Sequence, residues 1–203
     1  STGKPKGIRV RNENVCNLCS CVNDSCILVG WEINVLYCRS ATFDVFLVDI
    51  LSALVRGVGS VNVVAQGMER NVEYVCDVMM KREVSMINLV PSYVIVLCSC
   101  SRFVMCISVD VVTLAGEALS IQAFKQLKLR LGNQNSNIWN LYGPTEVTCI
   151  VTQKNIQSLP QHVHDHGFVA IGKSFTGVQL KITSDCSMWL CGNQVSSGYI
   201  GRD

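Results

Sequence analysis

The sequence predicts an α/β protein with a mostly parallel sheet, flanking helices and a β-rich C-terminal portion. Up to residue 159, strand-like runs alternate with helix-like runs at a period of about 25 residues, which is typical of βα units. The composition agrees, because 49% of the 203 residues are hydrophobic and 16% are charged. We therefore expect an α/β core over residues 1–159 and the start of a β-rich subdomain over residues 160–203.

The first half of the chain contains predicted helices that alternate with predicted strands. In the first helix, Val15, Leu18 and Val22 recur at helical spacing and indicate one apolar face. The second helix is apolar on nearly every side and closes at Gly57, so we expect it to be buried. The predicted helices cover residues 12–27, 43–55 and 72–79, and the predicted strands cover residues 33–38, 61–65 and 85–90.

The second half continues this alternation and changes near residue 160. Residues 84–101 carry no charge, so a membrane-spanning helix is one alternative, but Pro91 interrupts the run and favours a buried strand followed by a short helix. Ser120 is a suitable N-cap for a helix that ends at Gly132. The remaining predicted strands cover residues 109–114, 137–141, 178–183 and 188–191.

Charge and cysteine content limit the partners and the compartment. The formal net charge of +2 gives no basic field, so we expect no nucleic-acid partner, and we expect no membrane contact either. Twelve cysteines without a secretion signal indicate reduced core cysteines in a cytoplasmic protein, with a metal site as the alternative. The candidate metal ligands are Cys16, Cys19, Cys21 and Cys26, then Cys98, Cys100 and Cys106, and finally His162, His164 and His166.

The stretch over residues 140–146 carries the densest set of functional groups. A tight turn is expected at Gly143-Pro144, because Gly tolerates unusual φ and Pro fixes its own. Around the turn, the ring of Tyr142 can stack on a base, the hydroxyl of Thr145 can bond a phosphate oxygen, and the carboxylate of Glu146 can hold Mg²⁺. A surface turn with a packed Tyr and a solvated Glu is the alternative.

Three further segments are candidates for a site. Residues 1–7 are small and basic and can face an anion with backbone N–H groups and a lysine, although a flexible basic loop is the alternative. Residues 115–118 and 142–146 both follow predicted strands, and ligands bind beyond the carboxyl ends of parallel strands. Asp44, at the start of the second predicted helix, is either an N-cap or a site carboxylate that faces an ammonium group.

These segments, in this order, resemble the adenylation domains of nonribosomal peptide synthetases, within the adenylate-forming, AMP-binding enzyme superfamily. Residues 1–7 are similar to the family's phosphate loop, and Thr42-Phe43-Asp44 is similar to its Phe-Asp segment. Residues 115–119 and 140–146 resemble the family's Gly-Gly-Glu-Ala-Leu and Asn-x-Tyr-Gly-Pro-Thr-Glu motifs. The resemblance covers essentially the whole chain and implies the large N-terminal subdomain of such an enzyme.

The resemblance implies an activity and a set of nucleotide-binding residues. The implied enzyme is a ligase that activates an amino acid with ATP and Mg²⁺, releases pyrophosphate, and transfers the aminoacyl group to the phosphopantetheine thiol of a carrier-protein domain. Thr145 and Glu146 match the catalytic contacts to the α-phosphate and to Mg²⁺. The other matched ATP-binding positions are Ser1, Thr2, Gly3, Lys6, Gly116, Glu117, Ala118, Asn140 and Tyr142.

The resemblance also implies a substrate pocket. Asp44 matches the carboxylate that pairs with the substrate α-amino group, which favours an amino acid over an aryl or fatty acid. The matched wall is mostly apolar and implies a medium-sized, largely apolar amino acid. The matched wall positions are Val45, Val48, Asn88, Thr113, Ala115, Leu141, Cys149 and Ile150.

The sequence departs from the family in two ways that keep alternatives open. The segment over residues 186–192 lacks the family's glutamate, and the small C-terminal domain with the adenylation lysine is expected beyond Asp203. We therefore expect a fragment that is inactive on its own. The alternatives are an acyl- or aryl-CoA ligase of the same superfamily and a degenerate, non-catalytic nucleotide-binding fragment.

Overall fold

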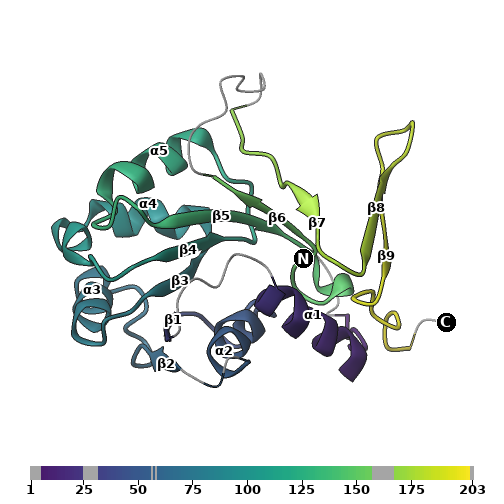
Figure 1. Cartoon of the computed structure of the whole chain (residues 1–203), viewed down its shortest axis with the longest axis horizontal. Helices are drawn as coiled ribbons and strands as arrows, with labels where there is room; N and C mark the ends of the chain where they lie inside the picture. Colours follow the sequence, from purple (N-terminus) through teal and green to yellow (C-terminus); the bar gives the residue numbers. More distant parts are fainter. Residues whose placement is uncertain (1–5, 25–31, 56, 58, 157–166, 202–203) are drawn as a thin grey trace.

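The computed structural model describes residues 6–24, 32–55, 57, 59–156 and 167–201, and it contains a seven-stranded sheet with helices on both faces. The strand order is β2-β1-β3-β4-β5-β6-β7 (Figure 1). β1 to β5 pair in parallel, whereas β6 and β7 are antiparallel to their neighbours. The prediction of a mostly parallel α/β sheet is therefore confirmed. The strands are β1 Ile33–Tyr37, β2 Gly59–Val63, β3 Met86–Leu89, β4 Val111–Leu114, β5 Asn137–Tyr142, β6 Thr152–Asn155 and β7 Lys173–Ser174.

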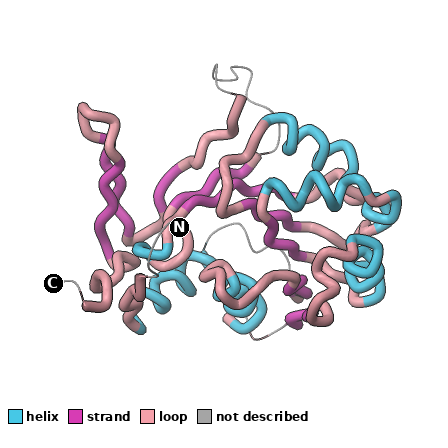
Figure 2. The backbone as a smooth tube through the Cα atoms, turned by 180° about the vertical axis from the view of Figure 1, so that it is seen from behind, coloured by secondary structure: helices cyan, strands magenta, loops and turns pink. Residues whose placement is uncertain are grey.

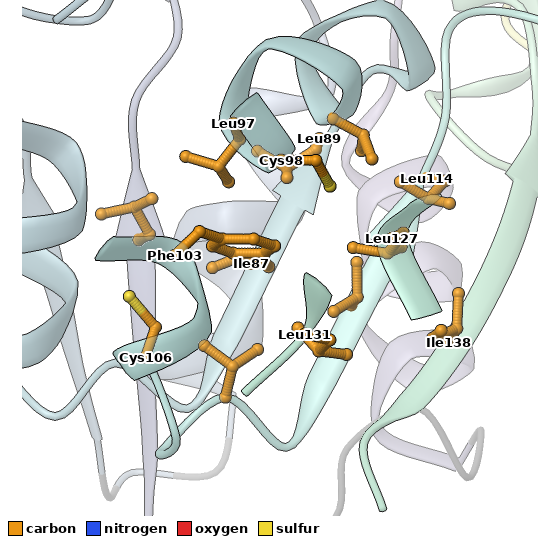
Figure 3. Close-up of a cluster of buried hydrophobic side chains, with 14 of the residues drawn as sticks. Ile87, Leu89, Leu97, Cys98, Phe103, Cys106, Leu114, Leu127, Leu131 and Ile138 are labelled. Carbon is orange, nitrogen blue, oxygen red and sulfur yellow. The ribbon is translucent and has the colours of Figure 1, made fainter. Parts of the chain in front are cut away.

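The helices form two layers, one on each face of the sheet. Side chains of α3, α4 and α5 pack on one face in a first core cluster, and side chains of α1 and α2 pack on the other face in a second (Figure 1). Figure 3 shows the first cluster, in which Phe103 and Leu127 pack against strand residues such as Ile87. The helices are α1 Asn12–Asp24, α2 Phe46–Leu54, α3 Val72–Lys81, α4 Pro91–Ser99, α5 Ile121–Arg130 and the short 3₁₀ segments η1 Ser101–Met105 and η2 Thr145–Val147.

Local signals predicted α4 and α5 correctly. Pro91 occupies the first turn of α4, where its missing N–H has no intrahelical partner to lose. The Ser120 hydroxyl accepts a hydrogen bond of 3.1 Å from the backbone N–H of Ala123 and caps α5. The uncharged run is thus β3 followed by α4, and the part of the chain that the structure describes has no helix long and apolar enough to cross a membrane.

The prediction of a buried helix over residues 43–55 was wrong in the residue at which the helix begins and in how far it is buried. α2 begins at Phe46, with Val45 at the N-cap position and no side-chain cap, so Asp44 does not act as an N-cap. The helix is also not buried throughout, because Leu54 is 65% exposed, and its buried residues include Asp49. A charged residue lies on the inner face because it has a buried partner, Arg39. The first predicted helix agrees with α1, although residues 25–31 lie outside the described part.

The C-terminal portion divides between the main sheet and a hairpin. β7 pairs with β6 at the edge of the main sheet. The strands expected over residues 178–183 and 188–191 form an antiparallel hairpin of β8 Val178–Ile182 and β9 Met188–Gly192, which projects away from the sheet (Figure 2). The hairpin confirms a β-rich end, and the expected boundary near residue 160 stays a prediction.

The cysteines have mixed environments. Cys98, Cys100 and Cys106 are buried in the first core cluster, whereas Cys16, Cys186 and Cys191 are exposed, so the expectation of core cysteines was wrong for these three exposed residues. Within the described ranges no cysteine is in a disulfide and no group of His, Cys, Asp and Glu could hold a metal ion. The candidates Cys26, His162, His164 and His166 lie outside these ranges.

Candidate active site

A cavity of about 870 Å³ opens at the carboxyl ends of the parallel strands. Arg39 follows β1, Val90 follows β3, and Gly116 follows β4, and all three line this cavity. Gly143, which follows β5, lines it as well. The cavity thus lies where open α/β sheets bind their ligands.

The turn after β5 packs its backbone directly against the chain that follows. Thr148 and Cys149 adopt positive φ angles of 57° and 79°, and the N–H of Val151 donates a 2.8 Å hydrogen bond to the carbonyl of Tyr142. The chain therefore doubles back, with Tyr142 half-buried at the end of β5 and Thr145 at the start of η2. Residues 142–146 therefore form a constrained turn in which Thr145 is exposed, and among these residues Gly143 lines the cavity whereas Tyr142, Thr145 and Glu146 do not.

We predict that Gly143→Ala lowers the free energy of unfolding by about 2 kcal/mol, as expected for overpacking. A Cβ atom on Gly143 would lie 2.5 Å from the Cα of Ile150 and 2.6 Å from the carbonyl oxygen of Cys149. Urea unfolding measures the change. The control is Gly67→Ala, which meets no atom within 4 Å but has a φ of +83° and should cost about 1 kcal/mol. Equal losses in the two variants would contradict the steric explanation.

Segments from both ends of the chain meet beside this turn. Ile8 forms an antiparallel bridge with Tyr199, and the N–H of Ile200 donates to the carbonyl of Gly7 at 2.8 Å. The ammonium of Lys6 consequently lies over the ring of Tyr199, whose hydroxyl donates a hydrogen bond to Oε1 of Glu146. Lys6 and Glu146, far apart in sequence, are thus brought together.

The surroundings of Glu146 keep its carboxylate anionic. The hydrogen bond from Tyr199 lowers its pKa below the ordinary value, and its own backbone N–H and the charge of Lys6 act in the same direction. A carboxylate that stays ionised on a rigid turn suits a divalent cation. The donor chemistry at Glu146 therefore fits Mg²⁺.

Two residues expected in the adenine pocket form side-chain hydrogen bonds with other residues of the protein. The carboxylate of Glu117 accepts hydrogen bonds from the N–H and hydroxyl of Ser92 at 2.9 and 2.8 Å, at the start of α4. Asn140 is buried, and its amide donates to the carbonyls of Val169 and Ala170 at 3.2 and 3.0 Å. Both side chains therefore fix segments around the site.

The other nucleotide-site positions are placed as follows. Gly116 has a φ of +87°, which only a residue without a Cβ adopts easily, and Ala118 is exposed beside it. Ser1, Thr2 and Gly3 lie outside the described residues, so the first part of the expected phosphate loop is not placed.

Asp44 lies on the cavity wall with part of its carboxylate buried. Its Oδ2 atom is inaccessible to solvent and has no hydrogen-bond partner among the described residues. Five of the nine expected substrate-pocket residues line the cavity, namely Asp44, Val45, Asn88, Ala115 and Cys149. The other four are buried away from it, namely Val48, Thr113, Leu141 and Ile150.

A buried polar network adjoins the cavity wall. Arg39 forms an ion pair with Asp49 at 2.9 Å, with side chains 14% and 0% exposed, and also donates to the carbonyl of Asn88. The amide of Asn88 donates to Asp49 and its oxygen accepts from Thr113. Asn88 and Thr113, expected as substrate contacts, therefore bind each other and the ion pair.

Burial raises the pKa of Asp49 to about 6, although Arg39 and Asn88 oppose the shift. Burial also raises the pKa of Cys149 well above its ordinary value, so its thiol stays neutral on the cavity wall. Arg39 and Asp49 were not predicted as site residues from the sequence. The available signal was an arginine directly after a predicted strand and an aspartate inside an apolar helix.

A mostly parallel sheet with a cavity at the carboxyl ends of its strands is the arrangement in which open α/β proteins bind ligands. The family described as AMP-binding enzyme matches residues 1–200. The chain belongs to the AMP-binding enzyme family.

Known proteins similar to the chain include nonribosomal peptide synthetases. Zwittermicin A synthase ZmaJ of Bacillus cereus is 27% identical over 210 residues, covering all of this chain and 38% of ZmaJ. Nonribosomal peptide synthetase agiA of Aspergillus flavus is 28% identical over 214 residues, covering all of this chain and 2% of agiA. The chain therefore spans well under half of the length of these relatives.

Solved structures share the fold. The N-terminal subdomain of Klebsiella oxytoca NpsA, in complex with anthranilyl-AMSN, has a TM-score of 0.82 at 19% identity, covering 99% of this chain and 51% of that one. The four-domain nonribosomal peptide synthetase AB3403, bound to AMP and glycine, also has a TM-score of 0.82, at 20% identity, covering 99% of this chain and 15% of that one. At these identities the likeness shows the fold.

Proposed function

We propose that the chain is part of an enzyme that activates an α-amino acid with ATP to an aminoacyl-adenylate. The observation that carries this proposal is the buried Oδ2 of Asp44, which has no partner on the cavity wall among the described residues. A buried carboxylate oxygen without a donor destabilises the protein. A substrate α-ammonium group supplies both the donor and the opposite charge, whereas a fatty or aryl acid has no such cation.

The nucleotide is assigned to the strand ends next to the Asp44 cavity. Tyr142 stacks on adenine, Thr145 contacts the α-phosphate, and Lys6 contacts the outer phosphates together with Ser1, Thr2 and Gly3. Because Glu117 and Asn140 already have protein partners, they shape the adenine pocket together with Gly116 and Ala118 rather than donate to the base. Glu146 holds Mg²⁺, which neutralises phosphate charge when bound.

The chemistry needs positioning rather than a protein nucleophile. A carboxylate oxygen of the amino acid attacks the α-phosphorus, the bond to the bridging oxygen of the β-phosphate breaks, and pyrophosphate leaves with the electron pair. Asp44 fixes the amino end of the substrate, so that its carboxylate is presented to the phosphorus. Lys6 stabilises the charge of the phosphates by its own positive charge.

The hydrocarbon part of the cavity wall favours an apolar substrate side chain. The substrate ammonium balances Asp44, and Arg39 is paired with Asp49, while the other charged residues on the wall are Glu69, Arg70 and Glu117. Hydrocarbon surfaces such as Val45 and Ala115 line the same wall. A medium-sized, largely apolar amino acid is therefore the proposed substrate class.

A phosphopantetheine thiol on a carrier-protein domain is the proposed acceptor, by likeness to the synthetases named above. Its sulfur attacks the acyl carbon, a thioester forms and AMP leaves.

A cytoplasmic location is proposed with this activity, because the free cysteines of the described part suit a reducing compartment. The second candidate is a degenerate nucleotide-binding fragment, favoured by the missing glutamate over residues 186–192.

Calorimetry with ATP and Mg²⁺ tests the nucleotide part of the proposal. Tyr142→Ala should weaken binding about tenfold to a hundredfold, since one stacked base is worth about 1–3 kcal/mol. Glu146→Gln should reduce only the increase in ATP affinity that Mg²⁺ produces. Tyr74→Phe, on α3 against the first core cluster, is the control. An unaltered affinity in Tyr142→Ala contradicts the assignment of the ring to adenine.

A further inference from the structure

Tyr199 contacts two residues of the proposed nucleotide site at once. Its hydroxyl donates a hydrogen bond to Oε1 of Glu146, and the ammonium of Lys6 lies over its ring at 5.4 Å from the centroid. Glu146 lies on η2 and Lys6 precedes α1, so these contacts join segments that the chain itself does not connect.

The backbone around Tyr199 is fixed relative to both partners. Tyr199 forms an antiparallel bridge with Ile8, close to Lys6. On the other side, the N–H of Ser196 donates to the carbonyl of Glu146 at 2.8 Å. The distance from Tyr199 to each partner is therefore set by backbone hydrogen bonds and does not depend on a ligand.

We propose that Tyr199 is a positioning residue that prepares Glu146 and Lys6 for a nucleoside triphosphate with its divalent cation. This inference rests on the proposed function, because it assumes that these two residues bind that ligand. The hydroxyl fixes the rotation of the Glu146 carboxylate, so that cation binding does not have to order it. A carboxylate that is already ordered loses less conformational entropy when it binds the cation.

The ring has a separate effect on Lys6. Lys6 is exposed, and without the ring its side chain would sample many rotamers. A cation–π contact at an exposed position is weak, so incoming phosphates can draw the ammonium away from the ring. Tyr199 therefore keeps Lys6 next to the carboxylate until the nucleotide arrives.

Two variants separate the hydroxyl from the ring. Tyr199→Phe removes the hydrogen bond to Glu146 and keeps the ring, whereas Tyr199→Leu removes both. Calorimetry measures ATP affinity with and without Mg²⁺. We expect Tyr199→Phe to reduce the enhancement of affinity by Mg²⁺ about tenfold, with Mg²⁺-free affinity changed less than about twofold. Tyr74→Phe is the matched control on α3 and should change neither affinity.

A nuclear magnetic resonance measurement without any ligand tests the ring. The side-chain methylene signals of Lys6 should be shifted upfield in the unmodified protein and in Tyr199→Phe, and should return to random-coil values in Tyr199→Leu. Identical Lys6 signals in all three proteins would overturn the proposal. Normal Mg²⁺-ATP binding by Tyr199→Phe would overturn it as well, while leaving the proposed function intact. Failure of the unmodified protein to bind ATP would instead refute the proposed function and this inference with it.

Discussion

Arg39→Met should lower the free energy of unfolding at pH 7.5 by about 2 kcal/mol, because it leaves a buried carboxyl group without its charged partner. Asp49 has no exposed side-chain surface and Arg39 is 14% exposed, so water replaces little of the lost attraction. The double variant Arg39→Met/Asp49→Leu removes both charges and should recover most of the loss. Chemical denaturation of the single and double variants measures both values.

The loss of stability in Arg39→Met should increase as the pH rises. The pKa of Asp49 is raised from 3.8 to about 6 in the folded protein, so the native state binds this proton more tightly than the unfolded state. The contribution of Asp49 protonation to stability is thus present in full below pH 3.8 and is lost as the pH rises through about 6. Without Arg39 the native pKa rises further, so the variant should differ little from the unmodified protein at pH 5 and strongly at pH 7.5.

An exposed ion pair provides the control for this prediction. Arg102 and Asp77 lie 2.6 Å apart with side chains 45% and 52% exposed, so Arg102→Met should cost at most about 1 kcal/mol. If the double variant of Arg39 and Asp49 were as unstable as Arg39→Met, the unpaired carboxylate would not be the cause.

Elements with strong local signals could be predicted from the sequence, and elements without them could not. Pro91 and Ser120 identify the starts of α4 and α5 because each acts within its own first turn. The start of α2 was misplaced because Asp44 is a good capping residue in isolation, whereas the chain gives the N-cap position to Val45. β6 was missed because Thr152–Asn155 is polar throughout, and its place in the sheet depends on pairing with β5 and β7.

The residues of the candidate site also fall into those that could be predicted from the sequence and those that could not. The strand-end segments that contain Gly116 and Tyr142 could be found because the period of the sheet places them at one edge. The contacts of Arg39 with Asp49 and of Tyr199 with Glu146 join distant segments, and no local pattern encodes such partners. The sequence could therefore suggest which residues bind ligands, while the residues that hold them in place required the tertiary structure.

Asp44→Asn should weaken binding of an aminoacyl-adenylate analogue by about a hundredfold or more, since it leaves the substrate ammonium without its counter-charge in a buried site. Asparagine keeps the size of the side chain, so the cavity retains its shape. The probes are the leucyl, alanyl, phenylalanyl and seryl sulfamoyl-adenosines, and calorimetry identifies the one that the unmodified protein binds best. The same measurement is then made on Asp44→Asn.

The decisive comparison uses the matching analogue without its α-amino group. That compound has no ammonium to pair, so Asp44→Asn should change its affinity by less than about threefold, and the unmodified protein should bind it weakly because the buried carboxylate remains unpaired. Folding should not suffer, because Oδ2 of Asp44 has no hydrogen-bond partner in the described protein to lose. Thermal unfolding verifies this point. Equal weakening of both analogues would show that Asp44 acts on the shape of the cavity rather than on the ammonium group, and a carboxylic acid without an amino group would then become the better candidate substrate.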